Sequence, residues 1–138
     1  MTQQDAEYWA KYNEPVFEEA RKNNGRSRRG EVIILHTIGA KSGREHVIPL
    51  NYSRDGDTYI VVASLGGSPR NPNWYHNLVA NPDIDVDVGG KTMPMRARVT
   101  EGAERDALFA KQVAKHSFYA GFQKKTTRII PVIALEPR

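Results

Sequence analysis

The chain lacks cysteine altogether, and this absence removes several kinds of chemistry. Disulfide bonds, thiolate metal sites, iron–sulfur clusters and cysteine nucleophiles are excluded. Also missing is any apolar run near the roughly 20 residues that a helix needs to cross a bilayer, and residues 1–14 contain no basic and apolar leader. We therefore expect a cytoplasmic protein without stable membrane insertion. The 138 residues, 39% of them hydrophobic and 26% charged, fit one globular domain.

Basic residues are in modest excess, with 20 Lys and Arg against 16 Asp and Glu and a net charge of +4. This balance favours an anionic partner, which leaves nucleic acid, a lipid surface and a phosphorylated or carboxylated cofactor open. The stretch from Arg21 to Arg29 contains no acid but holds Arg21, Lys22, Arg26, Arg28 and Arg29. Its Asn and Gly residues are typical of a loop, so we interpret it first as a solvated connector and second as an anion contact.

The first half of the chain predicts a helical segment followed by strands. Helical spacing from Asp5 to Lys22, interrupted by Pro15, predicts one bent helix or two short ones, with an apolar face of Tyr8, Trp9, Tyr12, Val16, Phe17 and Ala20. The run 32–35 predicts a buried strand that ends in a turn at 39–43. Residues 46–54 and 58–64 predict an antiparallel hairpin, because they flank the turn-forming Asp55-Gly56-Asp57.

The second half predicts two more hairpin strands between helices. A helix is expected over 74–80, with Asn71 as its N-cap and Pro72 as its first residue. Alternating residues over 83–88 and 91–100 predict two strands joined at Gly89-Gly90. A further helix, with Thr100 as N-cap, extends to about Lys115. The run 128–135 predicts a final strand, which Pro131 would place at an edge or a bulge.

This order of elements does not alternate as a Rossmann sheet requires. It favours a mainly β fold with α-helices, namely a small barrel of about six mostly antiparallel strands with peripheral helices. Within this single domain, residues 1–30 form a helical segment and basic linker, and residues 31–138 form the barrel.

The usual arrangements for hydrolysis or metal chemistry are missing. The histidines show no local metal-ligand spacing, and they are His36, His46, His76 and His116. No G-x-S-x-G motif surrounds Ser64. We expect no metal site, and we expect no hydrolytic triad.

Two glycine-containing loops suit an anion. In the segment 39–44, Lys41 and Ser42 lie between two glycines, although a plain hairpin turn also fits this pattern. The segment 66–74 leads into a helix N-terminus, whose N–H groups attract anions. Trp74 and Tyr75 follow, either flanking a planar ring or, for Trp74, packing in the core. The aromatic segment 116–122 is either a lid over a flat substrate or a plug beneath the barrel.

Taken in order, four motifs resemble those of one family. They are T-x-G-x-K-S-G at 37–43, A-S-x-G-G at 63–67, N-P-x-W-Y-x-N-L-x-A-N-P at 71–82 and R-x-I-P at 128–131. Over residues 34–137 the chain resembles the deazaflavin-dependent nitroreductase family, the F-420-dependent reductases of actinobacteria. The resemblance implies a split β-barrel related to the FMN-binding pyridoxamine-phosphate-oxidase fold.

The resemblance also implies a cofactor, coenzyme F-420, whose phosphate and oligoglutamate tail suit Lys41, Arg44, Arg70 and the basic stretch. Matched by position, the cofactor shell would comprise Lys41, Ser42, His46, Val47, Ile48, Pro49, Leu50, Val62, Ala63, Ser64, Trp74, Tyr75 and Asn77. Two residues are implied in catalysis. Ser64 would bind the ring or the acceptor by a hydrogen bond, and Tyr119 would cover the acceptor or supply a proton.

The implied reaction is hydride transfer from reduced F-420 to a conjugated small-molecule acceptor such as a quinone, an enone or a nitro compound. Where nitroimidazole-reducing members have tyrosine, lysine or arginine, this chain has Ala40, Asn51, Leu65, His116 and Phe122. Quinones and enones are therefore the safer expectation. Two alternatives stay open: an FMN-dependent reductase of the same fold, and a non-catalytic protein that binds F-420 or a fatty acyl ligand. We expect a monomer or homodimer that binds no nucleic acid.

Overall fold

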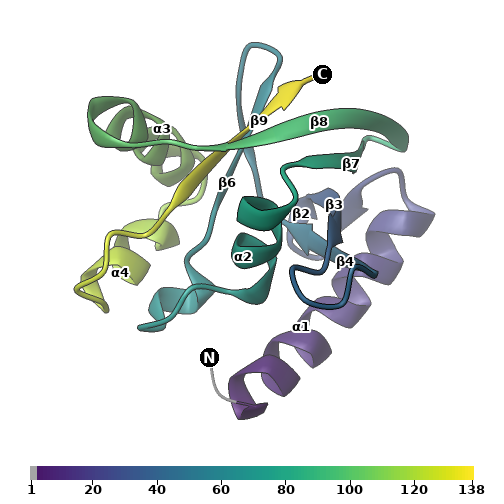
Figure 1. The fold of residues 1–138 in the computed structure, drawn as a ribbon, viewed down its shortest axis with the longest axis horizontal. Helices are drawn as coiled ribbons and strands as arrows, with labels where there is room; N and C mark the ends of the chain where they lie inside the picture. The colour runs from purple at the N-terminus through teal and green to yellow at the C-terminus, as the bar shows by residue number, and fades with distance from the viewer. Residues whose placement is uncertain (1–2) are drawn as a thin grey trace.

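The structure is a computed structural model that describes the backbone of residues 3–138 and the side chains of residues 11–138. Its elements in chain order are α1 (Gln3–Lys22), β1 (Arg26–Ser27), β2 (Gly30–Glu31), β3 (Ile33–Ile38), β4 (Glu45–Leu50), β5 (Ser53–Asp55), β6 (Thr58–Val62), η1 (Leu65–Gly67), α2 (Asn73–Ala80), β7 (Asp83–Val88), β8 (Lys91–Val99), α3 (Gly102–Lys115), α4 (Phe118–Lys124) and β9 (Val132–Pro137). Figure 1 shows α1 on one side of the molecule, with α3 and α4 on the other.

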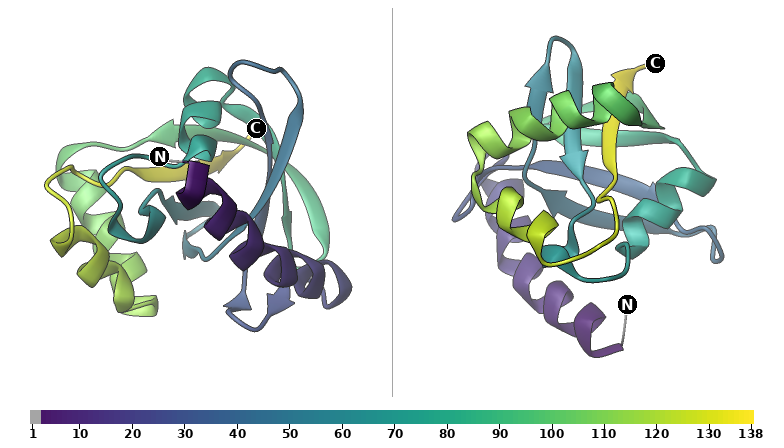
Figure 2. Two further views of the ribbon diagram at one scale, coloured as in Figure 1. Left: turned by 90° about the horizontal axis from the view of Figure 1, so that it is seen from below. Right: turned by 90° about the vertical axis from the view of Figure 1, so that its left-hand side faces the viewer.

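Seven strands form one curled sheet, in the order β4-β3-β7-β8-β9-β6-β5. Every neighbouring pair is antiparallel. The views in Figure 2 show how strongly the strands turn relative to one another. The two end strands, β4 and β5, follow each other in the chain without being neighbours in the sheet, so the barrel is split. The predicted antiparallel barrel with peripheral helices is confirmed.

Three strands are buried on both faces, which explains their dense apolar runs. Ile33 and Leu35 of β3 point into the barrel core, whereas Ile34 packs on the apolar stripe of α1 that contains Val16 and Ala20. Strands β6 and β9 alternate in the same way between the barrel core and the cluster beneath α3 and α4. The helices therefore cover the outer faces of the same strands that fill the barrel.

The hairpin at Asp55-Gly56-Asp57 is confirmed, because β5 and β6 pair with Asp55 opposite Thr58. Its first strand is not continuous over 46–54, however. The chain breaks at Asn51 and Tyr52, so that β4 pairs with β3 and β5 pairs with β6. Both residues are buried, and the Asn51 amide donates to the Arg29 carbonyl at 3.2 Å. This break, invisible in the hydrophobic pattern, lets the sheet split.

Both predicted N-caps are wrong. Pro72 occupies the N-cap of α2, and the Asn71 side chain instead accepts a hydrogen bond from Arg128 at 2.8 Å. Glu101 occupies the N-cap of α3. The buried Thr100 hydroxyl donates to the Val132 carbonyl at 2.8 Å, which pins β9 beside the end of β8. In both cases the side chain expected to cap a helix forms a hydrogen bond with a residue far along the chain instead.

The final strand begins later than predicted and does not lie at an edge. β9 runs from Val132 to Pro137 and pairs with β8 on one side and β6 on the other. Pro131 precedes the strand, where its missing N–H costs no ladder bond and its carbonyl accepts from the Ala63 N–H at 2.9 Å. The expectation that Pro131 marks an edge or a bulge is therefore wrong.

At the N-terminus, α1 is assigned as one helix with Pro15 inside it. The predicted packing of the Tyr8 and Trp9 side chains lies outside the described residues. The basic stretch is not a plain loop, because β1 and β2 form a short hairpin. Arg28 in its turn bonds to Glu19 of α1 at 3.0 Å.

Candidate functional site

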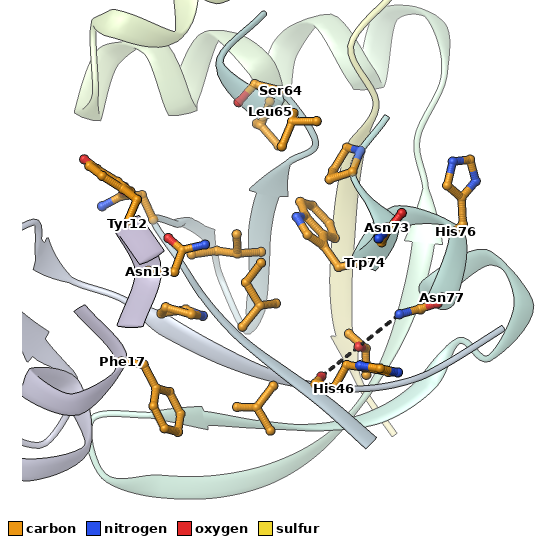
Figure 3. Close-up of a pocket in the computed structure, with 18 of the residues that line it drawn as sticks. Tyr12, Asn13, Phe17, His46, Ser64, Leu65, Asn73, Trp74, His76 and Asn77 are labelled. Carbon is orange, nitrogen blue, oxygen red and sulfur yellow. Dashed lines mark hydrogen bonds between the residues drawn. The ribbon is translucent and has the colours of Figure 1, made fainter. Parts of the chain in front are cut away.

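A cavity of about 1260 Å³ opens where α1, the β3–β4 turn, the end of β6, the start of α2 and α4 meet. Figure 3 shows Tyr12, Asn13 and Phe17 of α1 on one side and His46, Asn77 and His76 on the other. A volume of this size accommodates a cofactor together with a second small molecule. Its wall combines segments that are distant in the sequence.

The β3–β4 turn is fixed to α2 by side chains of two motifs. The side-chain oxygen of Asn77, Oδ1, accepts a hydrogen bond from the Ala40 N–H at 3.0 Å, and the buried Thr37 hydroxyl donates to the His46 backbone carbonyl at 2.8 Å. Asn77 also reaches the Thr37 hydroxyl at 3.5 Å (Figure 3). These contacts explain the joint presence of Thr37 and Asn77, since together they set the position of the turn.

Gly39 leaves space that the neighbouring side chains of the turn occupy. A Cβ built there would collide with Ser42 Oγ, which would have to move, and would lie 3.0 Å from His46 Nε2. These two atoms are themselves 3.3 Å apart, and Ser42 Oγ accepts from the Arg44 N–H at 3.2 Å. The turn thus holds an exposed hydroxyl and an exposed imidazole at the cavity wall, next to the exposed cations Lys41 and Arg44.

The loop after β6 carries Ser64 in an unusual backbone setting. Leu65, which follows it, has a φ of 45°, in the left-handed region that L side chains rarely adopt. Gly67, at φ 84°, lies so close to α4 that a Cβ would be 2.7 Å from the Phe122 carbonyl. The Ser64 side chain makes no cap hydrogen bond and lines the cavity. The strained loop therefore presents a hydroxyl to the ligand space.

Arg128 of the closing R-x-I-P motif holds this loop in place. Its guanidinium donates to the carbonyls of Ser64 at 2.8 Å, Ser68 at 2.9 Å and Ala63 at 3.2 Å, and to Asn71 Oδ1 at 2.8 Å. Partial burial of the guanidinium lowers the pKa of Arg128. Sequence reasoning did not assign Arg128 a role, although its motif was the available signal.

The aromatic segment after α3 is helical and forms one wall of the cavity. Tyr119 is 7% exposed and stacks on Phe118 with ring centroids 4.7 Å apart, while Phe122 meets it edge-on at 5.5 Å. Burial raises the pKa of the Tyr119 phenol, and the nearby Gln112 amide and Arg29 charge offset this only in part. The phenol is therefore held neutral beside the ligand space.

The α1 side of the cavity was missed by sequence reasoning. Tyr12, Asn13 and Phe17 line it together with Arg29, which lies over the Tyr12 ring at 5.1 Å. The only available signal was the amphipathic pattern of α1, which cannot distinguish a cavity wall from core packing.

Most of the residues expected around the cofactor or in catalysis surround this one cavity. Those that line it are Lys41, Ser42, His46, Val47, Ile48, Pro49, Leu50, Val62, Ser64, Trp74, Asn77 and Tyr119. Ala63 is fully buried in the barrel core instead, and Tyr75 packs against that core beside His76. Trp74 does both, since it is a core residue that also faces the cavity. Among the described residues, no cluster of His, Asp and Glu suits a metal ion, and no helix is long and apolar enough for a membrane span.

Comparison with known proteins identifies the family. The sequence profile described as F420H(2)-dependent quinone reductase matches residues 9–137. An F420H(2)-dependent quinone reductase from Mycobacterium tuberculosis is 41% identical over 109 residues, which cover 77% of this chain and 73% of that protein. Among solved structures, an F420-H2 dependent reductase, FDR-A, aligns with a TM-score of 0.71 at 40% identity, covering 76% of this chain and 93% of that one.

Two further structures bear on assembly and fold. A structure described as a domain-swapped dimer aligns with a TM-score of 0.72 at 33% identity, over 95% of this chain and 99% of that one. A Listeria innocua structure assigned to the pyridoxamine 5'-phosphate oxidases aligns with a TM-score of 0.57 at 15% identity, over 80% of this chain and 86% of that one. The latter supports the split-barrel fold alone. With a profile match over nearly its whole length, the chain belongs to the F420H(2)-dependent quinone reductase family.

Proposed function

We propose that the cavity binds reduced F-420 and that the protein passes its hydride to a quinone. The observation that carries this proposal is a cavity wall with a polar end at the β3–β4 turn, where two cations are exposed, and an aromatic end at α4. At the polar end, Lys41 and Arg44 are exposed and form no ion pair with any described side chain. Free cations of this kind suit the phosphate and carboxylates of a deazaflavin tail.

The middle of the cavity suits a flat ring. Apolar side chains of β4 and β6 and the Trp74 indole form its wall, and these residues include Ile48, Leu50 and Val62. The Ser64 hydroxyl borders the same space without a cap bond of its own, so it is available to a ring heteroatom or to the acceptor. The residues present therefore fit the cofactor that the family uses.

When bound, the reduced deazaflavin supplies the hydride, and the protein orients the partners and excludes water. Tyr119 and its aromatic neighbours, Phe118 and Phe122, form the aromatic end of the cavity wall and exclude water there. Because burial raises its pKa, the Tyr119 phenol keeps its proton and can donate a hydrogen bond or that proton to an acceptor oxygen. No metal or nucleophile is required by this chemistry.

Quinones are the acceptors that the family name specifies. Ala40, Asn51, Leu65 and Phe122, which replace polar residues of the nitroimidazole-reducing members, all line the cavity. Their apolar or amide character supports a preference for quinones and enones over nitroimidazoles. A homodimer is the assembly we propose, since a relative of 33% identity is described as a dimer, and size-exclusion chromatography with light scattering tests it.

The first experiment is a fluorescence titration with F-420, followed by an assay of reduced F-420 oxidation with menadione. Lys41→Ala is expected to weaken cofactor binding by about 1–3 kcal/mol, the contribution of a hydrogen bond to a charged group. Lys91→Ala, at the exposed start of β8 and away from the cavity, is the matched control and should bind normally.

Unchanged affinity in Lys41→Ala would remove this residue from the cofactor site. A yellow protein that releases FMN on denaturation would establish the FMN alternative instead. Saturable F-420 binding without oxidation by any quinone or enone would point to a carrier protein.

A further inference from the structure

Arg29 lies outside all four motifs that carry the family resemblance, yet its side chain lines the cavity. It lies in the turn of the β1–β2 hairpin, directly after Arg28, and reaches the cavity from the α1 side. Tyr12 and Asn13, which it contacts, lie across the cavity from His46 and Asn77 in Figure 3. Arg29 therefore belongs to the end opposite Lys41 and Arg44, the cations available to a cofactor tail.

The charge of Arg29 is poorly compensated. One terminal nitrogen donates to Asn13 Oδ1 at 3.2 Å, the other reaches the Pro49 carbonyl at 3.5 Å, and Nε is buried without a hydrogen-bond partner. No described carboxylate pairs with it, whereas the neighbouring Arg28 bonds to Glu19 at 3.0 Å. A partly buried guanidinium is normally matched by an anion. Glu14 of α1 lines the same cavity, but neither it nor any other described carboxylate forms an ion pair with Arg29.

Two ionisable groups lie within electrostatic range of Arg29. Its charge contributes to lowering the pKa of His116, after the larger effect of burial and together with Lys115. It also acts on Tyr119, whose pKa burial nevertheless raises. The His116 Nε2 atom is buried without a partner, and its ring lies 6.2 Å from that of Tyr119. A cation and a neutral phenol, Arg29 and Tyr119, thus line the same cavity, and the His116 ring lies beside Tyr119 outside its wall.

Resting on the function proposed above, we infer that Arg29 binds the acceptor oxygen that becomes negative during quinone reduction. The quinone gains a hydride, which carries two electrons and one proton, and becomes a hydroquinone anion. A second proton, donated by the Tyr119 phenol and replaced from solvent, then completes the hydroquinone. Because the guanidinium is already held at the cavity wall by Asn13, it stabilises the developing oxyanion without rearranging. Arg29 is thus a substrate-binding residue that favours acceptors with an oxygen able to carry negative charge.

The test compares Arg29→Gln and Arg29→Lys with Arg28→Gln, the adjacent exposed arginine, as the matched control. Removing one donor to an oxyanion typically lowers kcat by about 10²–10³-fold. We expect a loss of about 100-fold in kcat for menadione in Arg29→Gln, with F-420 affinity unchanged within about twofold. Arg29→Lys keeps the charge and should recover part of the rate, and Arg28→Gln should match the wild type.

A binding measurement keeps the inference independent of activity. 2-Hydroxy-1,4-naphthoquinone is an anion at neutral pH and mimics the charged product, while menadione is neutral. By isothermal titration calorimetry, Arg29→Gln should weaken the binding of the anion by about tenfold or more, in line with a lost charge-assisted hydrogen bond. The affinity for menadione should change much less.

Three results would overturn the inference. The first is equal kinetics in Arg29→Gln and Arg28→Gln, and the second is a parallel loss of F-420 affinity, which would assign Arg29 to the cofactor. The third is an equal loss of binding affinity for both quinones. The wild type could fail to oxidise reduced F-420 with any quinone and still bind the anion more tightly than menadione through Arg29. In that case the proposed function fails and the anion subsite stands.

Discussion

Replacing Arg128 tests whether one side chain organises the loop that carries Ser64. The guanidinium makes four hydrogen bonds, to three backbone carbonyls and to Asn71 Oδ1. At about 1.5 kcal/mol for each hydrogen bond to a charged group, the simple sum is about 6 kcal/mol. Two of the four acceptors, on Ala63 and Ser64, belong to buried residues, whereas those on Ser68 and Asn71 are more accessible and can be hydrated after truncation. Arg128→Ala is therefore expected to lose about 3 kcal/mol, or about 10 °C in Tm for a chain of this size.

The assay is urea unfolding of Arg128→Ala beside Arg96→Ala. Arg96 also makes a short, well-formed bond, to Asp83 at 2.7 Å, but both partners are exposed, so its removal should cost far less stability than the removal of Arg128. Arg128→Lys should lie between Arg128→Ala and the wild type, because an ammonium cannot reach all four acceptors at once. If the two alanine variants lost the same stability, the reasoning that Arg128 holds the loop would be refuted.

Two further predictions concern packing and protonation. Gly67→Ala should destabilise the protein by about 2–4 kcal/mol in urea unfolding, because a left-handed φ of 84° is combined with a Cβ only 2.7 Å from the Phe122 carbonyl. Gly56→Ala, with φ 64° and nothing within 4 Å, is the control and should lose only about 1 kcal/mol; equal losses would contradict the packing argument. Burial lowers the pKa of His116, so the unfolded chain binds its proton more readily, and stability that is complete above about pH 6.5 should fall as the pH drops below that value. When urea unfolding is measured from about pH 8 to 5, the free energy of unfolding of His116→Gln should fall less than that of the wild type. Identical pH profiles of this free energy would show that His116 does not contribute to the pH dependence of stability.

Local signals in the sequence predicted the elements that depend on neighbouring residues. Asp55-Gly56-Asp57 forms a tight turn because its own backbone preferences require one, and the alternation of β7 reflects the two faces of a strand. Such features need no knowledge of distant partners. They were enough to predict an antiparallel barrel and to exclude a Rossmann sheet.

The errors share a physical cause, which is a partner far along the chain. Thr100 bonds to a carbonyl 32 positions away, and Asn71 bonds to a guanidinium 57 positions away. A preference of about 1 kcal/mol for capping a helix does not outweigh a buried bond of that kind. Pro131 was misjudged for the same reason, since the place of β9 in the sheet depends on two strands that its own sequence does not specify.

The candidate site also contains residues that a local motif identified and residues whose role depends on the fold. The residues of the β3–β4 turn were named because a motif marks them, and the structure places Lys41 and Ser42 at the cavity wall. Arg29 was known only as part of a basic stretch, where nothing distinguishes it from Arg28. The difference between them arises from the fold, since one side chain faces Glu19 in solvent and the other faces the ligand space.

The place of β9 has a consequence for how the protein is made. The strands β4, β3, β7 and β8 form one part of the sheet, β6 and β5 form the other, and β9 is the neighbour that joins them. The site needs both parts, because His46 comes from one and Ser64 follows the other. During synthesis, neither half can meet its partner until residues 132–137 have left the ribosome, so the ligand cavity is completed after translation of nearly all of the described chain. A nascent chain stalled before Val132 would expose the apolar edges of β6 and β8, which makes it a substrate for chaperones and proteases.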